Sequence, residues 1–482
     1  MSKDFDLIIL GSGPAGYSSS MQAAKAGKNV LVVEANMEGF GGSWINTGTV
    51  PSKALREAAF TIYKYHSLIY GHKIGSQKPY EKYSMKDLLR FKDDVMKKET
   101  SSAKNYYIKN EIKTVRGFGK LIDSNTVEIK DSLGVIHTYT TEKVLISTGA
   151  KPLPPRNFEI DKVVIHDSAS ILKLDHFPRR LVIVGSGVHA IEFASIFAAM
   201  GTIVTILNEH KTYFNFVDSE IKEELEKSFT DLGILIQNGA HVMGVKSNKL
   251  RNKTEVRYSI DGSDQSLHVI ETDQVLYLGS RIPNSDELNL EAVGVEVDGK
   301  GFIKVDANYK TNNDSIYAAG DVVGYPSMAS ASFTQGRLST CHMFDIPAGE
   351  VSSLFPYGIY TLPEIASIGL TEAEAEKQGI NVSVGRASYD ILTRAQISST
   401  SNGLLKLVFE TDTFKLLGVH IIGESASEII HIGQAVIVRG DTIHYFIRNI
   451  MNYPTFAQAY QIAAFNGVNK VLQIGLKNQP KE

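Results

Sequence analysis

The chain has 482 residues, of which 43% are hydrophobic and 21% are charged, and its formal net charge is −3. This length is enough for several domains, and the small negative charge argues against nucleic acid as the main partner, because a basic surface is needed to collect phosphates. No run of ~18 apolar residues predicts a membrane span, and the amino end lacks the pattern of a signal peptide. The single cysteine, Cys341, has no partner for an intrachain disulfide. We therefore expect a cytoplasmic protein.

The chain opens with the pattern of a dinucleotide-binding unit. An apolar strand at 6–10 leads into Gly11, Gly13 and Gly16, a helix follows, and a second strand ends at Glu34. The glycines allow a tight turn and let a pyrophosphate approach the helix amino terminus, where free N–H groups face the anion. Glu34 lies 18 positions after the last glycine; it is suited to hold ribose hydroxyls and would repel a 2′-phosphate. The first site is predicted to take FAD or NAD.

Three segments follow within or after this unit. GGSWINTGTVPSK (41–53) opens a helix and carries the only tryptophan of the chain, Trp44. A long charged helix is predicted at 84–110, with a solvated face. The stretch TEKVLISTGAKPLPP (141–155) is a strand that leaves the unit through Thr148 and Gly149 and a proline-rich linker.

The glycine pattern returns 174 residues after its first appearance. Residues 179–208 contain Gly185, Gly187 and Ala190, then a helix and a strand that ends at Asn208, again 18 positions after the third residue of the motif. Two such units predict two dinucleotides in one polypeptide. Neutral Asn208 can hydrogen-bond a hydroxyl or a phosphate oxygen, and His210 and Lys211 follow it, so NAD and NADP are both expected to bind. The alternative is that Glu209 is the ribose residue, which would restrict the site to NAD.

Later segments complete the outline. DSIYAAGDVVGYP (314–326) ends a strand at Gly320 and Asp321; this carboxylate, at the usual ligand edge of a sheet, is suited to a polyol such as the ribityl chain, or else it caps a helix. From about 351, alternating strands and helices predict a separate α+β unit. Glu428 and His431, with Glu424 a turn earlier, resemble half of a di-iron site. A second such motif is needed for that site, so we predict no metal and a solvated or interface helix face.

Over essentially its whole length, the chain resembles the FAD-dependent pyridine nucleotide–disulfide oxidoreductases. The resemblance rests on GSGPAG, GGSWINTGTVPSKAL, ISTGAKP, GSGVHAIE, LGSRIPN, YAAGDVVGYPSMASASFTQGR and NYPTFAQAY, in the family's order. It implies an α/β fold with two Rossmann-like domains, a C-terminal α+β dimerisation domain and a homodimer. We expect the FAD-binding domain at 1–150 and 276–350, the NAD(P)-binding domain at 151–275 and the dimerisation domain at 351–482. The resemblance adds further cofactor contacts, at Gly42, Ser52, Thr148, Gly149, Gly279, Arg281, Gly320 and Asp321.

Four positions depart from the disulfide reductases of this family. Their two redox cysteines stand at Trp44 and Thr49, a histidine stands at Tyr453, and a glutamate stands at Gln458. Thiol–disulfide chemistry therefore has neither its nucleophile nor its acid–base partner here. The soluble pyridine nucleotide transhydrogenases, which several segments look most like, share Thr49 and Tyr453 but keep a cysteine at position 44 and a glutamate at position 458.

By the same resemblance, Lys53 pairs with Glu192 and holds a cation near the flavin N5, where hydride arrives. Trp44 is expected to cover the isoalloxazine by offset stacking, or else to be a core aromatic beside the adenine or ribityl. The expected reaction is flavin-mediated hydride transfer between NADPH and NAD. The alternatives are an NAD(P)H:quinone or dye reductase, and a non-catalytic flavoprotein that senses the nicotinamide pool.

Overall fold

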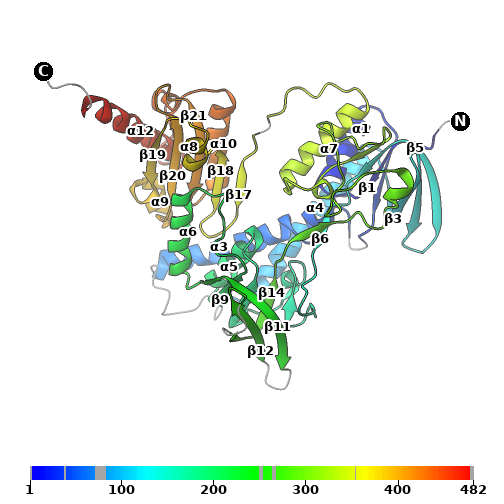
Figure 1. The fold of residues 1–482 in the computed structure, drawn as a ribbon, viewed down its shortest axis with the longest axis horizontal. Coiled ribbons are helices and arrows are strands. Elements are labelled where there is room, and N and C mark those ends of the chain that lie inside the picture. Colours follow the sequence, from blue (N-terminus) through cyan, green and yellow to red (C-terminus); the bar gives the residue numbers. More distant parts are fainter. Residues whose placement is uncertain are drawn as a thin grey trace.

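The computed structural model describes residues 3–36, 39–70, 83–248, 253–262, 267–352 and 354–477. These form three domains, of which the first lies on the right of Figure 1, the third on the left, and the second below and between them. Among the helices of the described residues, none is long and apolar enough to cross a bilayer.

The first domain is built on a sheet whose central strands are parallel. Its strands are β1 (Phe5–Leu10), β2 (Val30–Glu34), β3 (Lys113–Asp123), β4 (Thr126–Asp131), β5 (Ile136–Ile146) and β16 (Ile316–Ala318). β1 pairs in parallel with β2 and β5, while β3, β4 and β5 form an antiparallel meander. β1 and β2 are buried almost throughout, as continuous apolar runs in a central parallel sheet are expected to be. β16 joins this sheet from a distant part of the chain.

Helices carry the ligand-facing segments of this domain. They are α1 (Pro14–Lys25), α2 (Gly42–Asn46), α3 (Thr49–Tyr70), α4 (Met85–Lys109) and α7 (Ala329–Met343), with 3₁₀ turns η4 (Leu290–Val293) and η5 (Asp321–Val323). α1 and α7 lie side by side (Figure 1). A Cβ on Gly336 would lie 2.0 Å from the Ala15 carbonyl oxygen, so only glycine permits this approach. The charged helix expected at 84–110 is α4, which begins with a capping box between Ser84 and Asp87.

The second domain has a parallel sheet in the order β10-β9-β8-β14-β7. Its elements are β7 (Ile165–His166), η2 (Ile171–Lys173), β8 (Arg180–Val184), α5 (Val188–Ala199), β9 (Ile203–Asn208), α6 (Ser219–Asp231), β10 (Leu235–Asn238), β11 (Ala240–Asn248), β12 (Lys253–Ile260), β13 (Leu267–Thr272) and β14 (Gln274–Tyr277). β11, β12 and β13 form a separate antiparallel sheet. The expected boundary at residue 275 falls inside β14, which belongs as a whole to the second sheet. α5 is mostly apolar and is buried from Ala190 to Ala199, including Glu192.

Two short strands join the first and second domains. β6 (Ala150–Pro152) leaves the first domain and pairs antiparallel with β15 (Arg281–Pro283), which returns to it. This ladder places Arg281 beside the segment that contains Thr148 and Gly149. The cavity described below lies at this junction.

The third domain is an antiparallel sheet in the order β17-β18-β21-β20-β19 with helices around it. Its elements are β17 (Tyr357–Ile359), β18 (Ile365–Gly369), α8 (Glu372–Lys377), β19 (Val382–Ser388), η6 (Tyr389–Ile391), α9 (Thr393–Ser398), β20 (Leu404–Glu410), β21 (Leu416–Ile422), α10 (Ala426–Val438), α11 (His444–Arg448) and α12 (Gln458–Lys477). The strands expected from LLKLVFE and LLGVHIIG are β20 and β21, and the two expected helices are α10 and α12.

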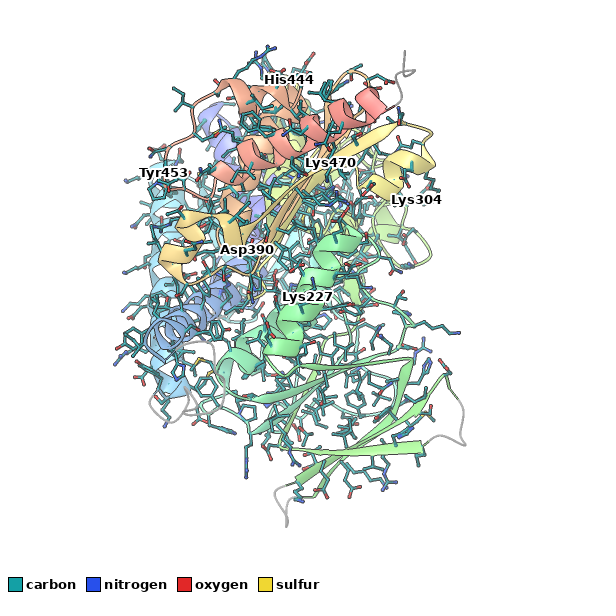
Figure 2. The ribbon with its side chains drawn as sticks, turned by 90° about the vertical axis from the view of Figure 1, so that its left-hand side faces the viewer. Lys227, Lys304, Asp390, His444, Tyr453 and Lys470 are labelled. Atoms are coloured by element: carbon teal, nitrogen blue, oxygen red, sulfur yellow. The ribbon has the colours of Figure 1, made fainter. Side chains whose placement is uncertain are left out.

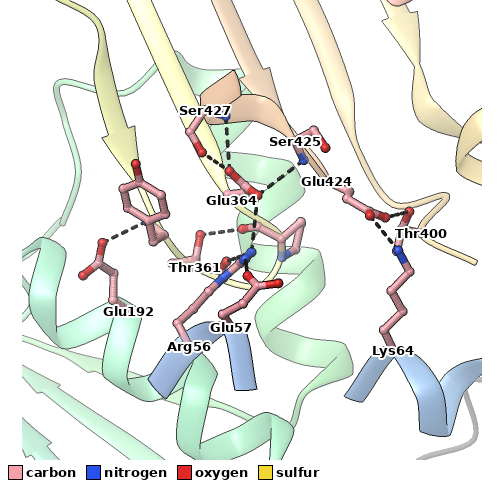
Figure 3. A network of polar contacts seen from close by, with 12 residues as sticks. Arg56, Glu57, Lys64, Glu192, Thr361, Glu364, Thr400, Glu424, Ser425 and Ser427 are labelled. Atoms are coloured by element: carbon pink, nitrogen blue, oxygen red, sulfur yellow. Dashed lines mark hydrogen bonds and ion pairs between the residues drawn. The ribbon is translucent and has the colours of Figure 1, made fainter. Parts of the chain in front are cut away.

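Buried ion pairs fix the third domain to the other two. Figure 3 shows α3 reaching this domain through Arg56, which donates to the Thr361 carbonyl oxygen at 3.1 Å, and Lys64, which bonds Glu424 at 2.6 Å. The side chain of Lys406 is fully buried among Asp218, Glu220 and Glu372. Burial alone would lower the pKa of Lys406, but these carboxylates raise it above its ordinary value. Removing one member would leave uncompensated charge in the interior, so the domain arrangement is strongly specified.

Candidate functional site

A cavity of about 600 Å³ lies at the carboxyl edge of the first sheet and extends to the second domain. Its volume is in the range of sites that hold large cofactors. Most of the predicted first-site residues line it: Gly11, Gly13, Glu34, Gly42, Trp44, Thr49, Ser52, Thr148, Gly149, Arg281, Gly320 and Asp321. The second domain contributes His189 and Phe193 from α5. Residues from distant parts of the chain thus share one wall.

The glycine loop leaves room for a ligand at the start of α1. Gly11 has φ 103°, and a Cβ there would lie 2.4 Å from the Ser147 carbonyl oxygen. A Cβ on Gly16 would lie 2.0 Å from the Gly11 carbonyl oxygen, so the helix packs directly on the turn. A Cβ on Gly13 would meet nothing within 4 Å, and Gly13 caps α1 without any side-chain hydrogen bond. The open N–H groups of the first turn fit a pyrophosphate.

Glu34 lines this cavity at the end of β2. Its side chain is 6% exposed. Its carboxylate accepts hydrogen bonds from the Ser12 backbone N–H at 3.0 Å, the Ser12 hydroxyl and the Asn36 N–H at 2.7 Å. Two oxygens offer about four acceptor positions, so capacity remains for a ribose hydroxyl.

Two ion pairs act on His189, which lines the cavity; Arg281 and Asp321 of the second pair line it too, whereas Lys53 and Glu192 lie behind its wall. Lys53 Nζ lies 2.6 Å from Glu192 Oε2, and this carboxylate also accepts the Tyr360 N–H at 2.8 Å. The structure therefore contains the Lys53–Glu192 pair that the family resemblance implies. Arg281 Nη2 lies 3.3 Å from Asp321 Oδ2 and donates to the Ala150 carbonyl oxygen at 2.5 Å.

Trp44 lies on α2 at the cavity wall, where it belongs to an aromatic cluster. Its ring centroid is 5.0 Å from that of Phe333, at an interplanar angle of 82°, and 5.8 Å from that of Tyr17. The indole is half-buried. α1, α2 and α7 each contribute one ring, so Trp44 is held in place by contacts that its local sequence does not indicate. Thr49 begins α3 close by in the chain and also lines the cavity.

The second glycine loop repeats the geometry of the first. Gly185 has φ 117°, and a Cβ there would lie 2.3 Å from the Leu278 carbonyl oxygen. A Cβ on Gly187 would meet nothing within 4 Å, while Ala190 is fully buried against the sheet. Gly279 follows β14 beside this loop, and the Tyr277 hydroxyl would lie 2.2 Å from a Cβ on it. The open space at Gly187 fits a second pyrophosphate.

Asn208, which the sequence predicts to contact the ribose of a nicotinamide dinucleotide, does not face open space. It is fully buried. Its amide donates to the His210 carbonyl oxygen at 2.9 Å, the Thr212 carbonyl oxygen at 3.3 Å and Asn238 Oδ1 at 2.7 Å. Its oxygen accepts from the Ser186 hydroxyl at 2.6 Å and the His210 N–H at 3.1 Å. All its hydrogen-bonding capacity is used within the protein.

The neighbour of Asn208 is the side chain that reaches outward. Glu209 is 71% exposed, and its carboxylate lies 3.5 Å from His241 Nδ1. β9 and β10 are adjacent parallel strands that both end here, so Glu209 and His241 lie at the edge where nucleotides bind in such sheets. His241 has no sequence motif of its own, because only the pairing of β9 with β10 brings it here.

Tyr453 lies outside the cavity. It is 62% exposed on the rim of the third domain (Figure 2), and its hydroxyl is 2.8 Å from the Thr393 hydroxyl. Glu424 and His431, which suggested half a metal site, bond to Lys64 and Gln434 instead. Within the described part of the chain, no group of three or more His, Cys, Asp or Glu side chains is placed to hold a metal.

Comparison with known proteins agrees with this arrangement. Residues 5–336 match the pyridine nucleotide-disulphide oxidoreductase family, and residues 355–464 match its dimerisation domain. The chain belongs to this family. Its members bind FAD and a nicotinamide dinucleotide, and the chain has a glycine loop for each. As a member of the family, the protein is an FAD-dependent oxidoreductase.

Relatives in the pyridine nucleotide-disulphide oxidoreductase family match nearly end to end. The chain is 38% identical over 472 residues to the soluble pyridine nucleotide transhydrogenase of Marinomonas sp. (strain MWYL1), covering 97% of this chain and 99% of the relative. It is 38% identical over 471 residues to the protein of the same name from Mycobacterium bovis (strain BCG / Pasteur 1173P2), with 97% and 98% covered.

Solved structures share the fold at lower identity. LpdA from Mycobacterium tuberculosis has a TM-score of 0.86 at 23% identity, covering 95% of this chain and 98% of that one. The HOCl-induced flavoprotein disulfide reductase RclA from Escherichia coli has a TM-score of 0.84 at 24% identity, covering 95% and 99%. These likenesses concern the fold alone.

Proposed function

We propose that the protein is an FAD-dependent NAD(P) transhydrogenase that moves hydride between NADPH and NAD⁺ through one nicotinamide site. The relatives at 38% identity carry the name soluble pyridine nucleotide transhydrogenase. The observation that carries the proposal is that Trp44 and Thr49 line the cavity where disulfide reductases of the family have their redox cysteines. The only cysteine, Cys341, is 3% exposed within α7. A dinucleotide acceptor needs no thiol, so both half-reactions remain possible.

The residues of the first site would hold FAD and prepare it for hydride. The open N–H groups behind Gly13 would bind the pyrophosphate, Glu34 the adenosine ribose, and Asp321 the ribityl hydroxyls. The hydride-carrying chemistry would be supplied by FAD when it is bound. Lys53, held at 2.6 Å by Glu192, would stabilise negative charge that develops there. Because Glu192 is nearly buried and also bonds Tyr360, the ammonium is oriented before any substrate arrives.

Trp44 would close the face that a disulfide occupies in the reductases. Its ring is fixed on one side by Phe333 and Tyr17 and is half-buried. A fixed indole on the cavity wall excludes small disulfides by size. Offset stacking on the isoalloxazine stays a prediction.

We also propose a homodimer in the cytoplasm. The dimerisation-domain match at 355–464 supports self-association. Tyr453 and Ile450, which are 62% and 99% exposed, lie on one loop before α12, and we place this loop against the partner. The compartment is proposed from the single buried cysteine. Size-exclusion chromatography with light scattering tests the dimer.

Stopped-flow spectroscopy tests the reaction. The FAD-loaded protein is mixed with NADPH and the flavin absorbance followed, and then NAD⁺ is added. Bleaching by NADPH and recovery with NAD⁺ are the expected results. Recovery of the flavin absorbance only with a quinone would indicate a quinone reductase instead of a transhydrogenase. No bleaching by NADPH would indicate a flavoprotein without this activity.

A further inference from the structure

His189 is a titratable residue at the meeting point of the two dinucleotide-binding domains. It is the second residue of α5, in the second domain, yet it lines the cavity of the first together with Phe193 one turn later. Its side chain is open to the cavity. Among the described residues the imidazole has no hydrogen-bond partner, so its nitrogens are free to act on what the cavity holds.

The charges that face His189 are already neutralised in pairs. Lys53 on α3 is paired with Glu192 on α5, and Arg281 on β15 is paired with Asp321 on η5. These four are the charged groups that act on His189. Each pair joins a cation on one element to an anion on another, and His189 is the one group in this set that is able to change its charge near neutral pH.

The surroundings favour the neutral form of His189. Loss of hydration lowers the pKa of His189 below its ordinary value of 6.5, although the ring is open to the cavity on one side. Glu192 and Asp321 oppose this shift, while Lys53 and Arg281 reinforce it. The ring also stands in the first turn of α5, where the helix dipole disfavours a cation.

We propose that His189 takes up a proton when the bound flavin is reduced and returns it when the flavin is reoxidised. The inference rests on the proposed function. Hydride transfer adds two electrons and one proton to the flavin and leaves it with one negative charge at neutral pH. A negative charge on a flavin held in the cavity that His189 lines would favour the protonated imidazole, which takes its proton from solvent. Release of hydride to NAD⁺ removes that charge and the proton leaves, so no net proton is consumed in a full cycle.

His189 takes up a proton on flavin reduction only within a limited range of pH, which we call the pH window. Below the lowered pKa of His189 in the oxidised protein, the ring is protonated in both redox states. Above its pKa in the reduced protein, the ring is neutral in both. Only between these two values does reduction change its charge, and the window therefore begins below 6.5. Within it, the protonated ring stabilises reduced flavin while one nicotinamide leaves and the other enters.

The test is the pH dependence of the flavin midpoint potential in the FAD-loaded protein. One proton for each electron pair changes the potential by about 30 mV per pH unit. Between about pH 5.5 and about pH 8.5, the parent is expected to show a steeper slope than His189→Gln by about 30 mV per pH unit inside the window, and an equal slope above it. His176→Gln is the matched control, because His176 is 57% exposed beside Asp175; it should keep the slope of the parent.

A second measurement keeps the inference testable if His189→Gln loses FAD. NMR of ring-labelled histidine in the unaltered holoprotein follows His189 directly, and its pKa should rise on reduction by dithionite. Equal slopes in the parent and His189→Gln, or a pKa of His189 that does not move on reduction, would overturn the inference. These outcomes are distinct from failure of the proposed function, which would show as no FAD binding or no bleaching by NADPH.

Discussion

The two glycine loops have nearly the same backbone conformation. They differ in the residue that ends the following strand of each unit, which is an acid, Glu34, in the first and a neutral amide, Asn208, in the second. Gly11 and Gly185 both adopt positive φ and both touch a carbonyl oxygen, while Gly13 and Gly187 both leave open space. The serine inside each loop bonds the residue at the end of the second strand, Ser12 to Glu34 and Ser186 to Asn208.

The difference between Glu34 and Asn208 shows how the side chain at one strand position decides whether hydrogen-bonding capacity is left for a ligand. A carboxylate has only acceptors, so Glu34 gathers N–H and O–H groups and still has acceptor positions open to the cavity. An amide also needs acceptors, and Asn208 finds them in the turn that follows it and in Asn238. Asn208 therefore stabilises its own loop, and Glu209 is the side chain at this strand end that faces outward. The following predictions test this contrast, in order of decreasing effect.

Replacing the open glycine of either loop by valine should abolish binding of the cofactor at that loop and leave binding at the other loop intact. Gly13→Val puts a side chain in space that is otherwise empty, so the apoprotein should fold while FAD binding weakens by about a hundredfold or more, because the pyrophosphate loses its path. Gly187→Val should retain FAD and lose NADPH and NADH. Gly299→Val is the control, since a Cβ there also meets nothing within 4 Å. FAD content and nicotinamide titrations decide; full FAD in Gly13→Val would show that this loop does not bind it.

Asn208→Asp and Glu209→Gln should separate a structural residue from a ligand-facing one. Asn208→Asp turns a buried donor into a carboxylate that faces three oxygens, which should cost ~2–4 kcal/mol of unfolding free energy and weaken both nicotinamides alike. Glu209→Gln should leave stability unchanged and favour NADPH over NADH by a few-fold, because a like charge near the 2′-phosphate is gone. Urea unfolding and dissociation constants test this. A stable Asn208→Asp with altered preference would restore Asn208 as the ribose residue.

Trp44 lines the cavity beside the first glycine loop and, as the only tryptophan, has no counterpart beside the second. If its ring covers the flavin, its emission should be strongly quenched in the holoprotein and recover when FAD is removed. Trp44→Ala should lower the free energy of unfolding by ~1–3 kcal/mol, which is less than the loss expected for a fully buried indole. Oxygen should also reoxidise the reduced flavin of this variant faster than that of the parent. Phe333→Leu, which removes the edge contact, should show a weaker form of both effects. Bright emission in the holoprotein would mean that the indole points away from the flavin.

The smallest effect is expected at the only thiol. Cys341 is buried in α7, away from the residues that line the cavity. Cys341→Ser and arsenite treatment should both leave flavin reduction by NADPH within a few-fold of the parent. A loss above about tenfold with normal FAD content would contradict thiol-free transfer.

The local sequence was sufficient to predict those helices, strands and turns that depend on short-range patterns. Both βαβ units, α4, α10 and the strands β20 and β21 appear where apolar periodicity and glycine placement predict them. Glycine spacing also predicts where the helix amino termini lie open for a ligand, because a tight turn and a close approach have few solutions in φ and ψ. The single cysteine excluded an intrachain disulfide, and Trp44 and Thr49 at the positions of the family's redox cysteines argued for thiol-free chemistry.

Tertiary structure decided the contacts between residues distant in the chain. His189 reads as one polar residue in an apolar helix, and only the docking of α5 against the first domain puts it in the cavity. Trp44 meets Phe333 because α7 packs closely on α1, and His241 meets Glu209 because β10 lies beside β9. Asn208 looked like a ligand residue because its strand position is that of Glu34. Its orientation depends on which acceptors the folded loop supplies, and that is a property of packing rather than of local pattern.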